Sequence, residues 1–138
     1  MTSNERRELL ERRELFSRNP AALLGSRCAS CGAFRFPASD LCPACQSTDV
    51  SSVPLSTSGI LYTFTIVRNR PPGYAGEVPY AFGFVDLAAN GLRVISTLIA
   101  DELDDLAIGD TVDFELFALG TGEDALESYR YRRREAPP

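Results

Sequence analysis

Hydrophobic and polar residues alternate along most of the second half of the chain. A period of two is typical of a β-strand that buries one face. The alternation is clearest at 111–119, where Asp113 and Glu115 are separated by apolar residues. The segments with this pattern are 60–67, 80–87, 92–100, 111–119 and 127–133, with a shorter one at 50–55. The chain is therefore expected to be mainly β.

Local signals predict how these strands are connected. Asn90-Gly91 tolerates positive φ and predicts a tight hairpin turn, whereas Ser58-Gly59 predicts a bulge or bend. Residues 101–109 are expected to form a short acidic connector of one or two helical turns. The alternation within 60–67 predicts that one set of side chains faces the core: Ile60, Tyr62, Phe64 and Ile66.

The number and spacing of the strands predict a small closed architecture. Five or six short strands within about 85 residues fit a Greek-key barrel, and a five-stranded OB fold matches them best. An SH3-like barrel or a sandwich remains open, because the number of strands does not fix their order.

The N-terminal region has a different pattern. Residues 3–18 fit a charged helix that Thr2 or Ser3 could cap. Asn19-Pro20 would end this helix, and 21–26 would link it to the next segment. The predicted division is an N-terminal helix and linker at 1–26, a four-cysteine ribbon at 27–47 and the barrel at 48–138.

All four cysteines lie in the predicted ribbon, as two Cys-x-x-Cys pairs. Each pair can fold into a tight turn that directs two thiolates at one point, and two such turns complete a tetrahedral sulfur shell suited to Zn2+. The expected metal ligands are Cys28, Cys31, Cys42 and Cys45. Because a closed shell leaves no position for a substrate, the metal would stabilise the fold rather than catalyse.

Two alternatives to zinc follow from the same residues. Disulfides are possible for any four cysteines, although no signal peptide indicates an oxidising compartment. Iron also binds four thiolates, and Cys-x-x-Cys-Gly with Cys-Pro-x-Cys is similar to the rubredoxin-type knuckle. The spacing does not distinguish zinc from iron.

Composition excludes several classes of activity. The sequence has no histidine, so a Ser-His or Cys-His nucleophile pair cannot be built from it. Its net charge of −5 opposes general binding to a phosphate backbone, although all 14 cations are arginines and several crowd the C-terminus. No apolar run approaches the roughly 20 residues of a membrane span, and a cytoplasmic location is expected.

One long loop is the candidate for ligand binding. Residues 68–80 contain three prolines and lie between two predicted strands. Long loops on a barrel often bind ligands, and arginine with aromatic residues suits a phosphate and a planar base. Arg68, Arg70 and Tyr74 are therefore expected to contact a cofactor or a partner, unless they only solvate the loop.

A series of short motifs extends over almost the whole chain. They are Cys28-x-x-Cys31-Gly32, Phe36-Pro37, Cys42-Pro43-x-Cys45, Gly59-x-Leu61-Tyr62-Thr63-Phe64-Thr65, Pro71-Pro72-Gly73-Tyr74 with Val78-Pro79-Tyr80, Gly91-Leu92-Arg93-Val94 and Ile108-Gly109-Asp110-x-Val112. In this ordered set the chain resembles the DUF35 family of acyl-CoA-associated OB-fold proteins with a rubredoxin-like zinc ribbon.

The resemblance implies a non-catalytic subunit. Family members assemble with thiolase-fold enzymes, including thiolases, acyltransferases and retro-aldolases of aromatic and steroid degradation. The partner would supply the catalytic residues, and this chain would help to enclose the CoA part of an acyl-CoA, in a 2:2 heterotetramer. Two other functions remain open from the residues alone, a single-stranded nucleic-acid binder and a rubredoxin-like electron carrier.

Overall fold

The computed structural model describes residues 15–74, 76–120 and 122–135. Most of the predicted N-terminal helix lies outside these residues. Its predicted end is wrong, because Phe16–Arg18 forms strand β1 and pairs antiparallel with β2, Ala21–Cys28. The ring of Phe16 also lies against Tyr129, with centroids 6.2 Å apart. Pairing and packing thus override the helical pattern at these positions.

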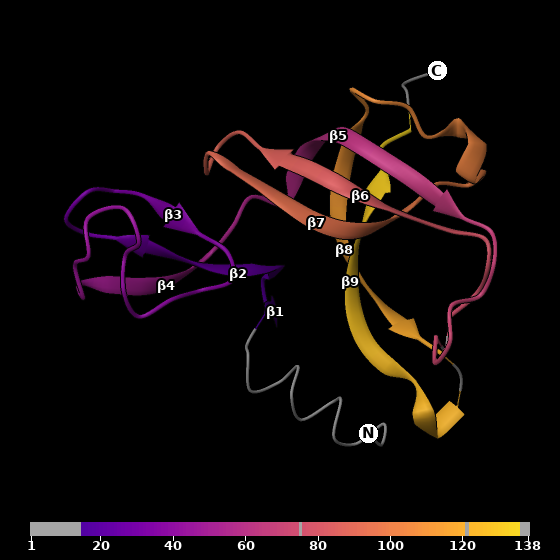
Figure 1. Ribbon diagram of the computed structural model, residues 1–138, viewed down its shortest axis with the longest axis horizontal. Helices are drawn as coiled ribbons and strands as arrows, with labels where there is room; N and C mark the ends of the chain where they lie inside the picture. The colour runs from indigo at the N-terminus through magenta and orange to yellow at the C-terminus, as the bar shows by residue number, and fades with distance from the viewer. Residues whose placement is uncertain (1–14, 75, 121, 136–138) are drawn as a thin grey trace.

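Strand β2 is the centre of a small sheet that forms the ribbon (Figure 1). It pairs with β1, with β3 at Phe34–Arg35 and with β4 at Val50–Pro54. The prediction that 21–26 is a linker is therefore wrong. Strand β4, expected to belong to the barrel, instead pairs with β2 along its whole length.

The remaining strands close into a five-stranded barrel, as predicted. They are β5 Ser58–Val67, β6 Tyr80–Leu87, β7 Leu92–Ile99, β8 Thr111–Leu119 and β9 Leu126–Arg133. The order is β5-β6-β7-β9-β8, with β7 and β9 parallel and β8 pairing back to β5. Closure excludes a sandwich and leaves none of these five strands as a free sheet edge.

The connections between the barrel strands differ in length and in structure. A 3-10 turn at Leu103–Asp105 lies in the predicted acidic connector, and a second one, Gly122–Asp124, lies between β8 and β9. The hairpin between β6 and β7 has Gly91 at φ +65°, as its sequence predicted. The long loop 68–80 connects β5 to β6 at the opposite end of these two strands (Figure 1).

A bulge in β5 overturns part of the predicted core. The pairing of β5 with β6 shifts between Leu61 and Thr63, so the strand reverses its inward face at this point. Ile60 and Tyr62, expected inside, are exposed, whereas Leu61 is fully buried. Beyond the bulge Phe64 and Ile66 pack against the core, as predicted.

The ribbon and the barrel share one hydrophobic core. Leu23 of β2 and Leu55, just after β4, belong to the same buried cluster as residues of every barrel strand. The barrel contributes Leu61, Ala81, Val85, Leu87, Val94, Leu98, Val112 and Tyr131. The ribbon is thus packed on the barrel rather than tethered to it.

Strand pairing explains why acids and arginines are segregated along the sequence. Strand β8 carries the acids and β9 the arginines, and the two strands lie side by side. Glu115 accepts hydrogen bonds from Arg130 and Arg132, each at 2.6 Å. Arg134 pairs with Asp113 at 2.6 Å and Arg133 with Asp110 at 3.0 Å. The crowded C-terminal arginines therefore form an ion-pair ladder rather than an exposed basic patch.

We expect this ladder to make stability fall in acid. Partial burial alone would raise the pKa of Glu115, but the hydrogen bonds from Arg132 and Arg130 outweigh it and lower that pKa. The hydrogen bond from Arg134 likewise lowers the pKa of Asp113. Their stabilisation is complete above the ordinary values of 4.5 and 3.8, and is lost as pH falls through the lower folded values. Glu115→Gln should cost about 1 kcal/mol at pH 7 and flatten this pH dependence in urea titrations; an unchanged slope would contradict it.

A second prediction concerns Tyr131. Its side chain is fully buried against Phe114, and its hydroxyl has no hydrogen-bond partner among the described residues. An orphaned buried hydroxyl is costly, so Tyr131→Phe should leave the free energy of unfolding unchanged or raise it by about 1 kcal/mol. The control is Tyr129→Phe, which removes a hydrogen bond from the Tyr129 hydroxyl to the carbonyl of Ile95 and should lower stability. Destabilisation by Tyr131→Phe would show that its hydroxyl does have a partner.

Candidate metal centre and loop pocket

The two Cys-x-x-Cys turns have the same backbone geometry. In the first, Cys28 N–H donates to the carbonyl of Ala33 and Gly32 N–H donates to that of Cys28. In the second, Cys42 N–H donates to Ser47 and Gln46 N–H to Cys42. The predicted pair of knuckles is therefore present, with each set of hydrogen bonds closing a tight loop around two thiols.

Each knuckle needs positive φ at the residue that follows its second cysteine. Gly32 takes φ +78° in the first knuckle, and Gln46 takes φ +63° in the second. Glycine adopts this conformation without strain, whereas glutamine does so at a cost. A methyl group added at Gly32 would meet no atom closer than 3.6 Å, so only the backbone conformation requires glycine there.

The structure brings all four predicted ligands together. The sulfur atoms lie within 4.8 Å of one another, with Cys28 to Cys45 and Cys31 to Cys42 each at 3.6 Å. A tetrahedral zinc site with Zn–S bonds near 2.3 Å requires sulfur separations of about 3.8 Å. All four cysteines are free rather than disulfide-bonded. The geometry of the donor set thus fits zinc.

The pKa values of these thiols show how strongly the four groups influence one another. A backbone hydrogen bond from Cys31 is the main cause that lowers the pKa of Cys28 to about 6, and one from Cys45 lowers the pKa of Cys42. For Cys45, a backbone hydrogen bond from Ser47 favours the thiolate, but the neighbouring thiols outweigh it and raise the pKa to about 12. Four thiolates this close together repel one another unless a metal ion neutralises them.

The three predicted loop residues have separate roles in the structure. Arg70 donates to the carbonyls of Tyr74 and Gly76, so its guanidinium holds the loop in shape. Arg68 is exposed and lies 3.6 Å from Asp104. Of the three, Tyr74 alone lines the adjacent pocket.

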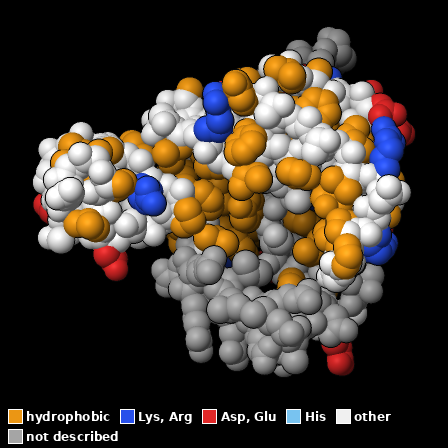
Figure 2. Space-filling model, in the orientation of Figure 1, with side chains coloured by type: hydrophobic (Ala, Val, Ile, Leu, Met, Phe, Trp, Pro, Cys, Tyr) orange, Lys and Arg blue, Asp and Glu red, His pale blue; other side chains and the backbone are white. Residues whose placement is uncertain are grey.

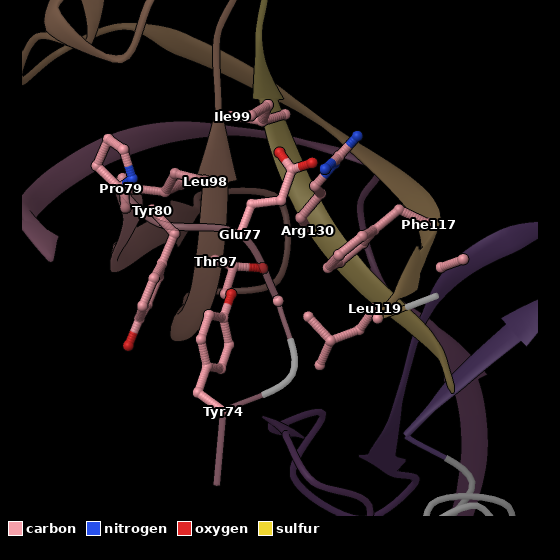
Figure 3. A pocket seen from close by; sticks show the side chains of 14 residues that line it. Tyr74, Glu77, Pro79, Tyr80, Thr97, Leu98, Ile99, Phe117, Leu119 and Arg130 are labelled. Atoms are coloured by element: carbon pink, nitrogen blue, oxygen red, sulfur yellow. The ribbon is translucent and has the colours of Figure 1, made fainter. Parts of the chain in front are cut away.

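This pocket, with a volume of about 420 Å³, lies between the long loop and the ends of β7, β8 and β9. Its aromatic and aliphatic walls face each other across the opening, while Glu77 and Arg130 supply the charged groups (Figure 3). The lining includes Tyr74, Tyr80, Phe117, Leu119, Glu77 and Arg130. Sequence reasoning missed the members from β8 and β9, because barrel closure alone brings them to the loop.

Close packing fixes the position of Tyr74. The ring lies 4.5 Å from that of Tyr80, centroid to centroid. A side chain at Gly76 would overlap the hydroxyl end of Tyr74 and a methyl group of Leu119, so any larger residue there must displace these side chains. Across the pocket, Arg130 lies over Phe117 at 4.4 Å and is paired with Glu115. The walls are thus held by interactions on both sides.

No helix in the described part of the chain is long and apolar enough to cross a membrane.

Known proteins with similar sequences are named as scaffolds and enzyme subunits. A DUF35 domain-containing scaffold protein of Methanocaldococcus jannaschii is 29% identical over 112 residues, which cover 80% of this chain and 79% of that protein. The benzoylsuccinyl-CoA thiolase subunit BbsA of Geobacter metallireducens is 34% identical over 113 residues, covering 80% of this chain and 74% of the subunit.

A solved structure has the same fold. A chain of the Ltp2-ChsH2(DUF35) aldolase superimposes with a TM-score of 0.65 and 29% identity, covering 81% of this chain and 84% of that one.

We expect loss of one ligand to release the metal and unfold the ribbon. Cys42→Ser should reduce zinc from one per chain to nearly none, because it removes one of the four thiolate ligands. The ribbon should then unfold, because metal binding supplies most of the folding free energy of such a site. Zinc and iron are measured together by mass spectrometry, and folding by dispersion of amide NMR signals. Ser30→Ala, which removes one exposed hydrogen bond to the hydroxyl of Ser47 but no thiol, is the matched control and should keep its metal. A folded, metal-free Cys42→Ser ribbon would contradict the assignment.

Two family models match the ribbon and the barrel separately. The rubredoxin-like zinc ribbon domain of ChsH2 matches residues 22–51, which contain the four cysteines. The C-terminal OB-fold domain of ChsH2 matches residues 52–116, which contain most of the barrel. The chain belongs to the DUF35 family and combines a ChsH2-type zinc ribbon with a ChsH2-type OB fold.

Proposed function

We propose that this protein is a non-catalytic accessory subunit of a thiolase-fold acyl-CoA enzyme. The observation that carries the proposal is the set of relatives, one of which is a subunit of benzoylsuccinyl-CoA thiolase, while a similar solved chain belongs to an aldolase assembly. The site chemistry agrees with it. All four cysteines converge on one centre and the sequence has no histidine, so the chain cannot build a Cys-His nucleophile pair.

The loop pocket is the proposed contact with the CoA part of the substrate. Aromatic walls with a few polar groups are typical of sites for partly apolar ligands, and the volume lies in their range. Tyr74 would touch the ligand directly, whereas Arg70 would act by holding the loop. Arg68 is exposed and weakly paired, so it remains available for a phosphate or a partner.

Electrostatics support an acyl-CoA enzyme subunit over a nucleic-acid binder. Binding along a phosphate backbone requires several unpaired cations in a groove. Near the pocket Arg130 is paired with Glu115, and Arg70 is hydrogen-bonded within its loop. For the electron carrier, the zinc ribbon match favours a metal without redox chemistry.

A tagged pull-down from the native host tests the proposal. The eluate should contain a near-stoichiometric thiolase-fold protein and one zinc per chain. We also propose a 2:2 assembly in the cytoplasm, which native mass spectrometry and cell fractionation would examine. Recovery of the chain alone, with nucleic acid or with iron, would overturn the accessory-subunit proposal.

Substitutions at two glycines of the loop test whether the pocket contacts the acyl-CoA. Gly76→Ala should displace Tyr74 and raise the KM for acyl-CoA of the assembled enzyme about tenfold, because the added methyl group overlaps the Tyr74 ring. Gly73→Ala is the control for the added methyl group, which there meets no atom within 4 Å; its φ of +78° adds a backbone cost that Gly76→Ala does not carry, so this control is the more demanding one. Equal KM values for the two variants would remove the pocket from the acyl-CoA site, and Arg68→Ala tests the exposed cation in the same assay.

A further inference from the structure

One face of the barrel exposes large hydrophobic side chains to solvent. They belong to β5, β6 and β7 and point outward because of the bulge in β5 and the alternation along β6 and β7. The relative exposures are 43% for Ile60, 48% for Tyr62, 40% for Phe84 and 51% for Ile95. Figure 2 shows hydrophobic side chains gathered on this side of the molecule. We call these four residues the apolar face.

The members of the apolar face are neighbours across strands. Phe84 is directly opposite Ile95 on β7 and opposite Thr63 on β5. Ile60 is opposite Asp86, two residues along β6 from Phe84. Adjacent exposed apolar residues of this size differ from isolated ones, because a contiguous patch usually marks an interaction surface.

The charged groups on this face neutralise each other. Arg93 donates two hydrogen bonds to the Asp86 carboxylate, at 2.6 and 3.2 Å. Its guanidinium also stacks on the Tyr62 ring, 3.4 Å from the centroid. The face therefore offers apolar contact area with no net charge, which complements an apolar protein surface rather than a polyanion.

The apolar face is continuous with the loop pocket. Along β6, Tyr80 and Phe82 lie on the same side as Phe84, and the ring centroids of Tyr80 and Phe82 are 6.4 Å apart. Tyr80 in turn lies against Tyr74 in the pocket wall. A protein that covers the apolar face would thus end beside the opening of the pocket.

We infer that the apolar face docks the catalytic subunit of the assembly, an inference that rests on the proposed function. The partner must present an apolar surface, because the exposed side chains of the face are hydrophobic. Strand addition to the barrel is excluded, because a closed barrel has no free strand edge. Four central side chains would form the core of an interface of about 800 Å² per partner. The pocket then opens at the interface, where both subunits reach the same acyl-CoA.

Charge placed on this face should break the assembly. Ile95→Glu should weaken binding to the catalytic subunit at least about thirtyfold, measured by calorimetry with the co-purified partner. Leu41→Glu is the matched control, because Leu41 is 49% exposed and lies on the ribbon rather than on β5, β6 or β7; its affinity should stay within about threefold. The thermal transition and zinc content of both variants report folding.

A second, more conservative substitution at Ile95 keeps the test valid if Ile95→Glu does not fold. Ile95→Thr keeps a β-branched residue in the strand and should still weaken binding about tenfold. If the wild-type chain recovers no thiolase-fold partner, the proposed function fails. If the wild type recovers it and folded Ile95→Glu and Ile95→Thr variants bind with unchanged affinity, the docking inference alone fails. Dimerisation of this chain or retention of nucleic acid through the same face would also overturn it.

Discussion

Four thiols held within 4.8 Å of one another form the constraint on which the rest of the structure depends. In their thiolate form, four sulfur atoms this close together require a cation, and zinc fits their spacing. Cys28 ends β2 and pairs with Val50, the first residue of β4, so the metal centre fixes where these two strands meet. Their pairing in turn places Leu23 and Leu55 in the core of the barrel. The ribbon is thus joined to the barrel through the shared core.

The sequence allowed the features with a strong local cause to be predicted. The spacing of the cysteines identified the knuckles, and the alternation along 111–119 identified the most regular strand of a five-stranded barrel. The pairing of β2 was missed because the apolar residues of 21–28 do not alternate and the segment follows Asn19-Pro20. Ile60 and Tyr62 were misplaced because the bulge that reverses the face of β5 lies between Leu61 and Thr63, and not at Ser58-Gly59, where the sequence predicted a bulge or bend.

The candidate pocket was only half predictable. The loop composition identified Tyr74, but the opposite wall comes from β8 and β9, which are distant in sequence and meet the loop through barrel closure. The arginines illustrate the same limit. Arg70 and Arg130 are ordinary cations in the sequence, and the structure alone shows that loop carbonyls and Glu115 engage them. Residue type therefore predicted which kind of ligand a side chain could bind, but not whether other groups of the protein already engage that side chain.

Stability and function are separated in this molecule: the four-cysteine centre and the shared core hold the fold, whereas the apolar face and the adjoining pocket are the proposed contacts with the partner and the substrate. Hydroxyl-radical footprinting of the chain, alone and with its co-purified catalytic subunit, tests this most directly. Oxidation of Tyr62 and Phe84 should fall severalfold in the assembly, while that of Leu41 on the ribbon stays unchanged. Equal protection of all three residues, or protection of Leu41 alone, would contradict the proposed docking face.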